Sequence, residues 1–204
     1  MSAGLAKPHL LTFEEFLDFE ETSSTRHEYH QGRLVEMTFG VSEAHDIAAG
    51  NTFAAIHAKL GGKTPCRVHQ SGLALRVEAA DAGYYPDIFV TCDPRDRADP
   101  RAKRWPSLII EILSKSTRDY DRGDKFDSYR QIETLREYVL IDSESQGVVI
   151  FRPETTGRWV MTELGPDGVL DLESIGLSLP VSTIYAGTVV PLVRQWPRLV
   201  VLEP

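Results

Sequence analysis

Two apolar runs in the middle of the chain each carry a carboxylic acid, and this pattern constrains the fold more than any other feature. Residues 87–92 open on Asp87, and residues 108–113 hold Glu111 in their centre. Short runs rich in Ile, Leu and Val predict buried β-strands. A carboxylate inside such a strand has little access to water and is costly to bury unless a positive group neutralises it. We therefore expect a sheet in which Glu111 has a positively charged partner.

The elements around these runs alternate in a way that suits a mixed sheet flanked by helices. Thr12 and Glu15 form a capping box for a first helix that reaches about residue 19, while Ser42 and Gly61 mark the ends of a longer helix. A third helix is expected from 121 to about 134, and strands are expected at 28–37 (a hairpin bent at Gln31 and Gly32), 67–77 (with a bend near Gly72), 87–92, 108–113, 137–142, and 148–151 with 159–164 as a hairpin. The sequence predicts an α/β fold with a helix-strand-strand-strand-helix-strand core, preceded by a helix and hairpin and followed by a C-terminal hairpin.

Length and composition favour one domain over residues 1–204, because 204 residues that are 42% hydrophobic can bury one good core but not two. No apolar run approaches the length that spans a bilayer, and charges and a proline interrupt the apolar positions of the N-terminus. We therefore expect a soluble protein without a secretory signal. Cys66 and Cys92 lack the spacing of a CxxC or zinc-finger motif, which leaves a reduced, cytoplasmic setting as the default.

The two strand acids and a nearby lysine predict a metal-assisted hydrolase. Neighbouring strands lie about 5 Å apart, so Asp87 and Glu111 could share one cation at the end of a sheet. Two hard oxygen ligands suit Mg²⁺ or Mn²⁺, which complete their coordination with water and substrate phosphate. Lys125, early in the third helix, would orient or deprotonate the attacking water or stabilise charge on phosphate oxygens. The alternatives are a buried ion pair at Glu111 and a simple turn at Asp87.

The charge balance argues against a protein that coats nucleic acid through bulk electrostatics, because the formal net charge is −8. Residues 95–104 differ locally, since five basic residues and two acids give this loop a charge of +3. The loop could meet a phosphate backbone next to the two acids. The alternative is a solvated loop of mixed charge.

Several motifs together resemble the Uma-two family, a group of bacterial restriction-endonuclease-like proteins in the PD-(D/E)XK nuclease superfamily. The similar segments are Thr12 to Phe16, Tyr29 to Met37 with Gly32, His45, Tyr84-Tyr85-Pro86-Asp87-Ile88, Pro106 to Ser114 with Ser116 and Thr117, Asp121-Arg122-Gly123-Asp124-Lys125 with Tyr129, and Glu137 to Asp142. The resemblance implies a restriction-endonuclease-like fold and metal-dependent hydrolysis of DNA phosphodiester bonds. It further implies that Asp87 and Glu111 hold Mg²⁺ or Mn²⁺.

One position departs from the wider superfamily. The second half of the superfamily motif is an acid, any residue and then lysine, but Leu113 stands two residues after Glu111. In the Uma-two pattern the lysine has moved to the following helix, and Lys125 matches that position. Lys115 is a rival, although it lies past the end of the strand and is expected to be exposed.

Two further residues are candidates for the same site. The resemblance makes Glu28 a third acid near the metal and thus a fourth catalytic candidate beside Asp87, Glu111 and Lys125; its alternative is an acid on a surface strand. His45, on the first turn of the long helix, could face the site or serve in capping and packing.

Two other motifs fail on their spacing, and two other classes of protein are alternatives to a nuclease. His27 and His30 are three residues apart and not four, which excludes a zinc-protease helix, and the segment around Gly62 lacks the first glycine of a phosphate-binding loop. The principal alternative to an enzyme is a catalytically inactive nuclease-fold module that binds nucleic acid or protein. A third hypothesis is an interaction scaffold, in which the apolar residues 189–193 form a contact in a homodimer.

Overall fold

A six-stranded mixed sheet forms the centre of the computed structural model, which describes residues 10–37, 42–62 and 64–192. The strand order is β11-β10-β9-β8-β6-β3, and only β8 and β9 run parallel while all the other neighbours are antiparallel. The strands are β3 (Arg67–Gln70), β6 (Ile88–Thr91), β8 (Pro106–Leu113), β9 (Glu137–Asp142), β10 (Val148–Pro153) and β11 (Trp159–Leu164).

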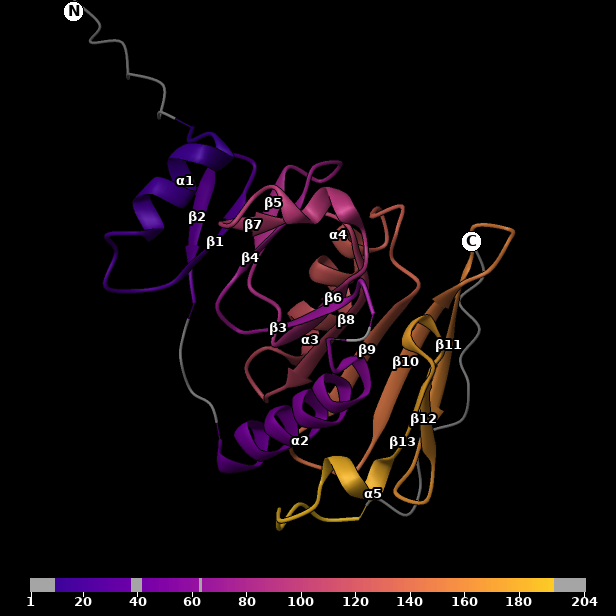
Figure 1. Ribbon diagram of the computed structural model, residues 1–204. Coiled ribbons are helices and arrows are strands. Elements are labelled where there is room, and N and C mark those ends of the chain that lie inside the picture. Colours follow the sequence, from indigo (N-terminus) through magenta and orange to yellow (C-terminus); the bar gives the residue numbers. More distant parts are fainter. Residues whose placement is uncertain (1–9, 38–41, 63, 193–204) are drawn as a thin grey trace, which may run out of the picture.

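Helices cover both faces of this sheet, as Figure 1 shows for α2. The described helices of the whole fold are α1 (Phe13–Glu20), α2 (Glu43–Leu60), α3 (Arg118–Tyr120), the π-helical turn η2 (Asp121–Lys125), α4 (Phe126–Tyr129) and α5 (Val181–Ile184), with 3₁₀ turns η1 (Pro94–Arg97) and η3 (Glu173–Ile175). Along the central sheet the chain runs α2, β3, β6, β8, the helical segment 118–129 and β9. This order confirms the predicted helix-strand-strand-strand-helix-strand core.

Two smaller sheets complete the fold. A five-stranded sheet in the order β2-β1-β5-β4-β7 packs with α1, and a two-stranded sheet joins β12 to β13. Their strands are β1 (His27–His30), β2 (Arg33–Glu36), β4 (Ala74–Val77), β5 (Ala82–Tyr84), β7 (Ala102–Lys103), β12 (Val169–Leu172) and β13 (Leu177–Pro180). In Figure 1, α1, β1 and β2 lie at one end of the molecule and β10 to β13 at the other.

The alternation of side chains along β8 gives each face of the central sheet its own core. Leu108, Ile110 and Ile112 pack with α2 and α5 in one cluster. Ile109 and Leu113 belong to a second cluster with Tyr129 of α4 and residues of β4 and β5. Because successive side chains of a strand point to opposite faces, Glu111 lies on the face that α4 covers.

Local signals in the sequence explain the start of α1 and both ends of α2. The Thr12 side chain accepts from the Glu15 N–H and the Glu15 carboxylate accepts from the Thr12 N–H, so the predicted capping box is confirmed. Ser42 caps α2 by accepting from the His45 N–H, and Gly61 ends it with φ 45°, a conformation that glycine adopts without steric cost.

Two predicted elements differ from the structure. The strand expected over 67–77 is divided into β3 and β4, which belong to different sheets, because Ser71 takes a positive φ of 44° and turns the chain. The helix expected from 121 to about 134 begins at Arg118 and ends at Tyr129, after which the chain makes turns toward β9.

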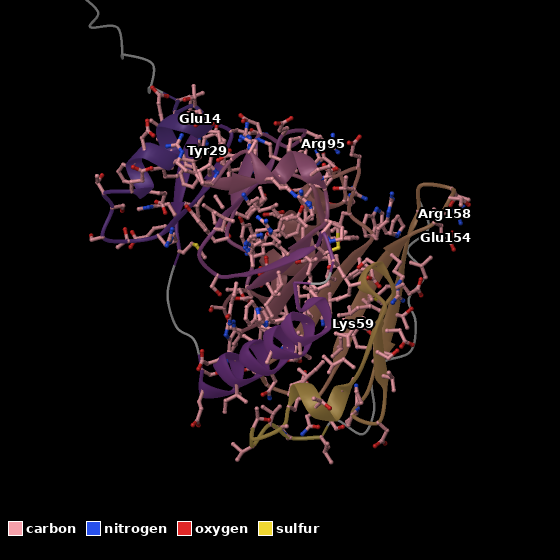
Figure 2. All side chains as sticks on the ribbon, viewed as in Figure 1. Glu14, Tyr29, Lys59, Arg95, Glu154 and Arg158 are labelled. Carbon is pink, nitrogen blue, oxygen red and sulfur yellow. A yellow bond between two sulfur atoms is a disulfide. The ribbon has the colours of Figure 1, made fainter. Side chains whose placement is uncertain are left out.

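The expectation of reduced cysteines is wrong for this structure, in which Cys66 and Cys92 form a disulfide (yellow in Figure 2). The register of β3 and β6 pairs Arg67 with Thr91, so the next residues outward, Cys66 and Cys92, face each other with Cα atoms 3.9 Å apart. The two cysteines are 26 residues apart in the sequence, and their spacing alone therefore gives no sign of the pairing.

Among the described residues, no helix has both the length and the apolar composition that a membrane-spanning helix requires.

Candidate functional site

Lys125 lies at the centre of a buried cluster of three carboxylates. Its Nζ atom is 3.1 Å from Oε1 of Glu28, 3.2 Å from Oε1 of Glu111 and 3.1 Å from Oδ1 of Asp121. None of these four side chains is more than 7% exposed. Burial of so many charges is tolerable only because opposite charges meet directly. The cluster confirms the expectation that Glu111 has a positive partner.

Three separate elements bring these groups together. Glu111 comes from β8 of the central sheet, and Glu28 comes from β1 of the five-stranded sheet. Asp121 and Lys125 are the first and last residues of the π-helical turn η2. The sequence identifies Lys125 and Glu28 only as candidates, and the structure places both beside Glu111. The interpretation of Glu28 as an acid on a surface strand is therefore wrong, since it is 4% exposed.

Asp87 and Glu111 meet across the neighbouring strands β6 and β8. The two strands are antiparallel with Ile88 opposite Ile110, so the next pair outward is Asp87 and Glu111. The Asp87 N–H donates to Oε2 of Glu111 at 3.2 Å, and the Ile112 N–H donates to Oδ2 of Asp87 at 2.8 Å. These bonds fix both carboxyl groups at the end of the strand pair. The simple-turn interpretation of Asp87 does not account for them.

Tyrosine hydroxyls complete the polar contacts of the cluster. Tyr129 donates to Oε1 of Glu111 at 3.0 Å, and Tyr120 donates to Oε2 of Glu28 at 2.9 Å. The ring of Tyr129 lies edge-on to that of Tyr138, with centroids 5.4 Å apart. Burial and the neighbouring Glu111 carboxylate raise the pKa of Tyr129 well above its usual value, so this hydroxyl stays a donor.

The charges in the cluster do not balance, and this affects protonation. Burial, above all, raises the pKa of Glu111 to about 8, and the carboxylates of Asp121 and Asp87 act in the same direction, while Lys125 acts against it. Burial lowers the pKa of Lys125, but the carboxylates of Glu111, Glu28 and Asp121 outweigh it and leave that pKa well above the usual value. At neutral pH, Lys125 is therefore an ammonium and the surplus proton resides on Glu111.

His45 faces Asp87 from the first turn of α2. Its Nε2 atom lies 3.4 Å from Oδ2 of Asp87. Burial lowers the pKa of His45, but the contact with Asp87 and the nearby carboxylates of Asp46 and Asp121 more than offset it and raise the pKa overall. The structure therefore favours the interpretation that His45 faces the site over a purely capping or packing role.

Asp87 and Glu111 have the donor atoms that a hard divalent cation requires. Within the described chain, Oδ1 of Asp87 accepts no hydrogen bond, and its side chain is 22% exposed. Burial, with help from the Asp121 and Asp87 carboxylates, raises the pKa of Glu111 to about 8, and a divalent cation would favour the ionised form because it binds in place of the proton. No group of three or more His, Cys, Asp or Glu side chains in residues 10–37, 42–62 and 64–192 forms a ready metal site. Two carboxylates fit Mg²⁺ or Mn²⁺, which keep several waters.

The cluster includes one residue that the sequence did not single out as a site candidate. Asp121 lies at the start of the third predicted helix and is not among the candidate site residues, yet it contacts Lys125. Its signal in the sequence is the spacing of four residues from Lys125, which places two helical side chains on one face. Lys115, the rival lysine, is exposed as expected.

The basic loop at 95–104 has a different environment from the one we expected. Three of its four arginines contact carboxylates: Arg95 pairs with Asp93 and Glu133, Arg101 with Glu14, Asp18 and Glu21, and Arg104 with Glu14, Glu78 and Asp99. Figure 2 shows Arg95 near the top of the view, whereas α2 lies near the bottom. The structure favours a loop of mixed charge, because these partners neutralise most of its basic groups. Arg95 and Arg104 also line a cavity of about 420 Å³ that none of Glu28, Asp87 and Glu111 borders.

Comparisons with known proteins identify the family to which the chain is similar. Residues 13–182 match the model of the Uma2 (Uma-two) family, described as "Putative restriction endonuclease". Two proteins of Synechocystis sp. (strain ATCC 27184 / PCC 6803 / Kazusa), both named "Uncharacterized protein", are similar in sequence. The protein slr1290 is 34% identical over 177 residues, which are 87% of this chain and 92% of the relative. The protein sll1609 is 30% identical over 162 residues, which are 78% and 90% of the two chains.

A solved structure resembles the whole fold. It is the crystal structure of "a putative nuclease belonging to DUF820" from Anabaena variabilis ATCC 29413. The two structures align with a TM-score of 0.70 at 19% identity, over 86% of this chain and 98% of the other. The alignment confirms the predicted α/β architecture of a mixed sheet flanked by helices.

Proposed function

This chain belongs to the Uma2 family, and from that membership and the cluster geometry we propose that it is a metal-dependent endonuclease that hydrolyses phosphodiester bonds in DNA. The observation that carries the proposal is the arrangement around Glu111. One of its oxygens faces Lys125 and Tyr129, and the other faces the backbone of Asp87. A buried carboxylate joined to a second acid on one side and an ammonium on the other suits a hydrolytic site.

Asp87 and Glu111 would hold Mg²⁺ or Mn²⁺ in this proposal. A bound ion of this kind polarises a phosphoryl group and lowers the pKa of a coordinated water. The chain itself supplies the orientation of both ligands, because the N–H groups of Asp87 and Ile112 each bond the carboxylate of the opposite acid. His45 supports Asp87 from the other side. Such outer contacts hold a ligand in a single orientation and are typical of metal sites.

Lys125 serves in this site as a fixed positive charge. The carboxylates of Glu111, Glu28 and Asp121 raise the pKa of Lys125, which favours the ammonium form and thus a charge-stabilising role over proton abstraction from water. The sequence leaves three roles open for Lys125: orienting the attacking water, deprotonating it, and stabilising charge on phosphate oxygens. A protonated lysine beside Glu111 supports the third role. Glu28 assists by holding the ammonium at 3.1 Å.

A plasmid-nicking assay tests the proposal. Native protein with supercoiled plasmid and Mg²⁺ or Mn²⁺ should produce nicked circles, whereas Asp87→Asn and Glu111→Gln should not. Asp124→Asn is the matched control, because Asp124 is an exposed acid in the same helical turn as Lys125. If the native protein cleaves neither single-stranded nor double-stranded DNA with any of several metals, the result counts against the proposal that it is an enzyme.

The second candidate is a catalytically inactive nuclease-fold module that binds nucleic acid or protein. It is favoured by the closed contacts of Lys125, whose ammonium already faces three carboxylates. Calorimetric titration with Mn²⁺ separates the two candidates. An enzyme should bind the ion and lose that binding in Glu111→Ala, whereas an inert module should bind none.

A homodimer is part of the proposal, because a cut in both strands is simplest for a symmetric pair. In the segment 189–193 of the third hypothesis, Val189 is 97% exposed and Leu192 is 59% exposed, while Val190 is buried. Residue 193 lies outside the described residues. Light scattering of native protein and of Val189→Ser tests whether this segment contributes to a dimer, and a native mass of one chain contradicts it.

A further inference from the structure

Carboxylates surround the ammonium of Lys125, which donates a hydrogen bond to Oε1 of Glu111 at 3.2 Å. An ammonium has three N–H groups, and three carboxylate oxygens lie within 3.2 Å of Nζ. The rings of Tyr84 and Tyr120 flank it, with centroids 6.0 and 5.6 Å away. Lys125 is therefore surrounded, and its position relative to Glu111 depends on its contacts with the carboxylates of Glu28 and Asp121.

Asp121 is the carboxylate with no evident task other than this contact. Its side chain is 4% exposed, and within the described residues its Oδ1 atom accepts no hydrogen bond. Glu28 differs, because its other oxygen accepts from Tyr120, and Glu111 accepts from Tyr129 and Asp87. A buried carboxylate is costly, so its retention beside Lys125 requires a compensating role.

The π-helical turn explains how Asp121 reaches the ammonium. The helical segment 118–129 widens between Asp121 and Lys125, and these two residues bound the turn. Turns of this kind are rare and occur frequently at functional sites. The neighbouring acid Asp124 lies in the same turn but is exposed, so the turn directs only one of its two acids inward.

We propose that Asp121 is a positioning residue that holds the Lys125 ammonium against Oε1 of Glu111, so that Glu111 keeps its other oxygen toward Asp87. This inference rests on the proposed function for its effect on catalysis, but the hold on Lys125 is a property of the folded chain. In this proposal Asp121 acts only through Lys125.

Competitive acetylation of lysine amines tests the hold without any need for activity. Folded protein is treated with a limiting amount of an amine-acetylating reagent, and the modification of each lysine is measured by peptide mass spectrometry. Exposed Lys115 is the internal reference, and Lys103, which is buried away from the cluster, reports that the chain remains folded. In Asp121→Asn, acetylation of Lys125 relative to Lys115 should rise about tenfold or more, as loss of one charged contact implies. Lys103 should stay protected.

Two further variants make the test specific. Asp124→Asn removes the same charge from the surface of the same turn and should leave the ratio unchanged. Asp121→Glu keeps the charge and should restore part of the protection, and it decides the outcome if Asp121→Asn does not fold. Unchanged protection of Lys125 in the folded Asp121→Asn variant overturns the proposal.

Kinetics connect the hold to catalysis. With plasmid substrate, Asp121→Asn should lower kcat about 10- to 100-fold and leave KM within about twofold, because a group that orients the site from outside costs this much. Asp121→Glu should recover part of kcat. A loose Lys125 with unchanged kcat overturns the positioning role. If native protein cleaves no DNA, the proposed function fails, while the acetylation ratio still decides whether Asp121 holds Lys125.

Discussion

The main-chain N–H of Asp87 donates to Oε2 of Glu111 at 3.2 Å, which joins the two acids across β6 and β8. The bond follows from the antiparallel register, in which Ile88 faces Ile110. Oε1, the other oxygen of Glu111, contacts Lys125. Glu111 thus connects the proposed metal site, at the end of the β6 and β8 pair, with the buried lysine. Substitutions of Glu111 therefore test both the metal site and the buried cluster.

Replacement of Glu111 by glutamine should lower both stability and activity. Because the pKa of Glu111 is raised to about 8, the native side chain is mainly neutral at pH 7. The amide has nearly the same shape, but its NH₂ group cannot accept a hydrogen bond, so either the Asp87 N–H or the Lys125 and Tyr129 donors lose an acceptor. The free energy of unfolding should therefore fall by about 1–3 kcal/mol at that pH. Cleavage should fall about 100-fold or more, since the amide is a poor ligand for a hard cation. Urea denaturation and plasmid nicking measure the two effects, and a Gln variant that cleaves at the native rate contradicts the assignment.

The pH dependence of metal binding should follow the same carboxyl group. A proton on Glu111 competes with the cation, so the affinity for Mn²⁺ should rise up to about tenfold per pH unit from pH 6 and level off above about pH 8. Calorimetry in buffers of different ionisation enthalpy should detect a proton released on binding below pH 8. An affinity that is constant from pH 6 to pH 8 contradicts the prediction.

The stability of the metal-free protein should move in the opposite direction. The pKa of Glu111 rises from its usual 4.5 to about 8 on folding, so its contribution is fully present below pH 4.5 and is lost as the pH rises through 8. Metal-free native protein should therefore show a lower melting temperature at pH 9 than at pH 6. Glu111→Gln, which cannot titrate, should show a smaller decrease, and equal decreases in both proteins count against the raised pKa.

Removal of the lysine charge should destabilise the fold. Lys125→Met keeps the apolar stem but leaves Glu28, Glu111 and Asp121 without their common partner. Loss of one partner in a buried ion cluster costs about 3–5 kcal/mol. Lys115→Met is the control, because this side chain is exposed and its loss should have little effect. Denaturation by urea measures both, and a loss below about 1 kcal/mol in Lys125→Met contradicts the central position of this residue.

The disulfide should contribute to stability in the isolated protein. Cys66 and Cys92 close a loop with a sequence separation of 26, for which the loss of chain entropy in the unfolded state corresponds to about 3 kcal/mol. Reductant should lower the melting temperature of native protein but not that of Cys92→Ser. Two free thiols in protein purified without reductant contradict the bond.

Local sequence signals predict the elements of this fold better than their partners. The capping residues Thr12 and Ser42 and the apolar runs around Asp87 and Glu111 give the helices and strands directly. The division of 67–77 between two sheets could not be predicted, because both halves have the same strand pattern. It depends on the positive φ of Ser71.

The candidate site shows the same limit. Asp87 and Glu111 could be paired from sequence, since consecutive buried strands are commonly neighbours in a sheet. Asp121 was missed because an acid at the start of a helix has an ordinary explanation in the helix dipole, and no local pattern predicts the π-helical turn. The charge of the 95–104 loop could not be judged from its own residues, because Arg101 pairs with Glu14 and Asp18 of α1, which are more distant in the sequence. Such long-range ion pairs leave no mark on the local sequence.

Anomalous diffraction from crystals of the native protein soaked in Mn²⁺ tests the central claim most directly. We expect one anomalous peak between the carboxylates of Asp87 and Glu111, with Lys125 still in contact with Glu111, and no peak in crystals of Glu111→Gln grown and soaked in the same way. A native crystal with no peak there, or with its peak bound by other residues, contradicts the account.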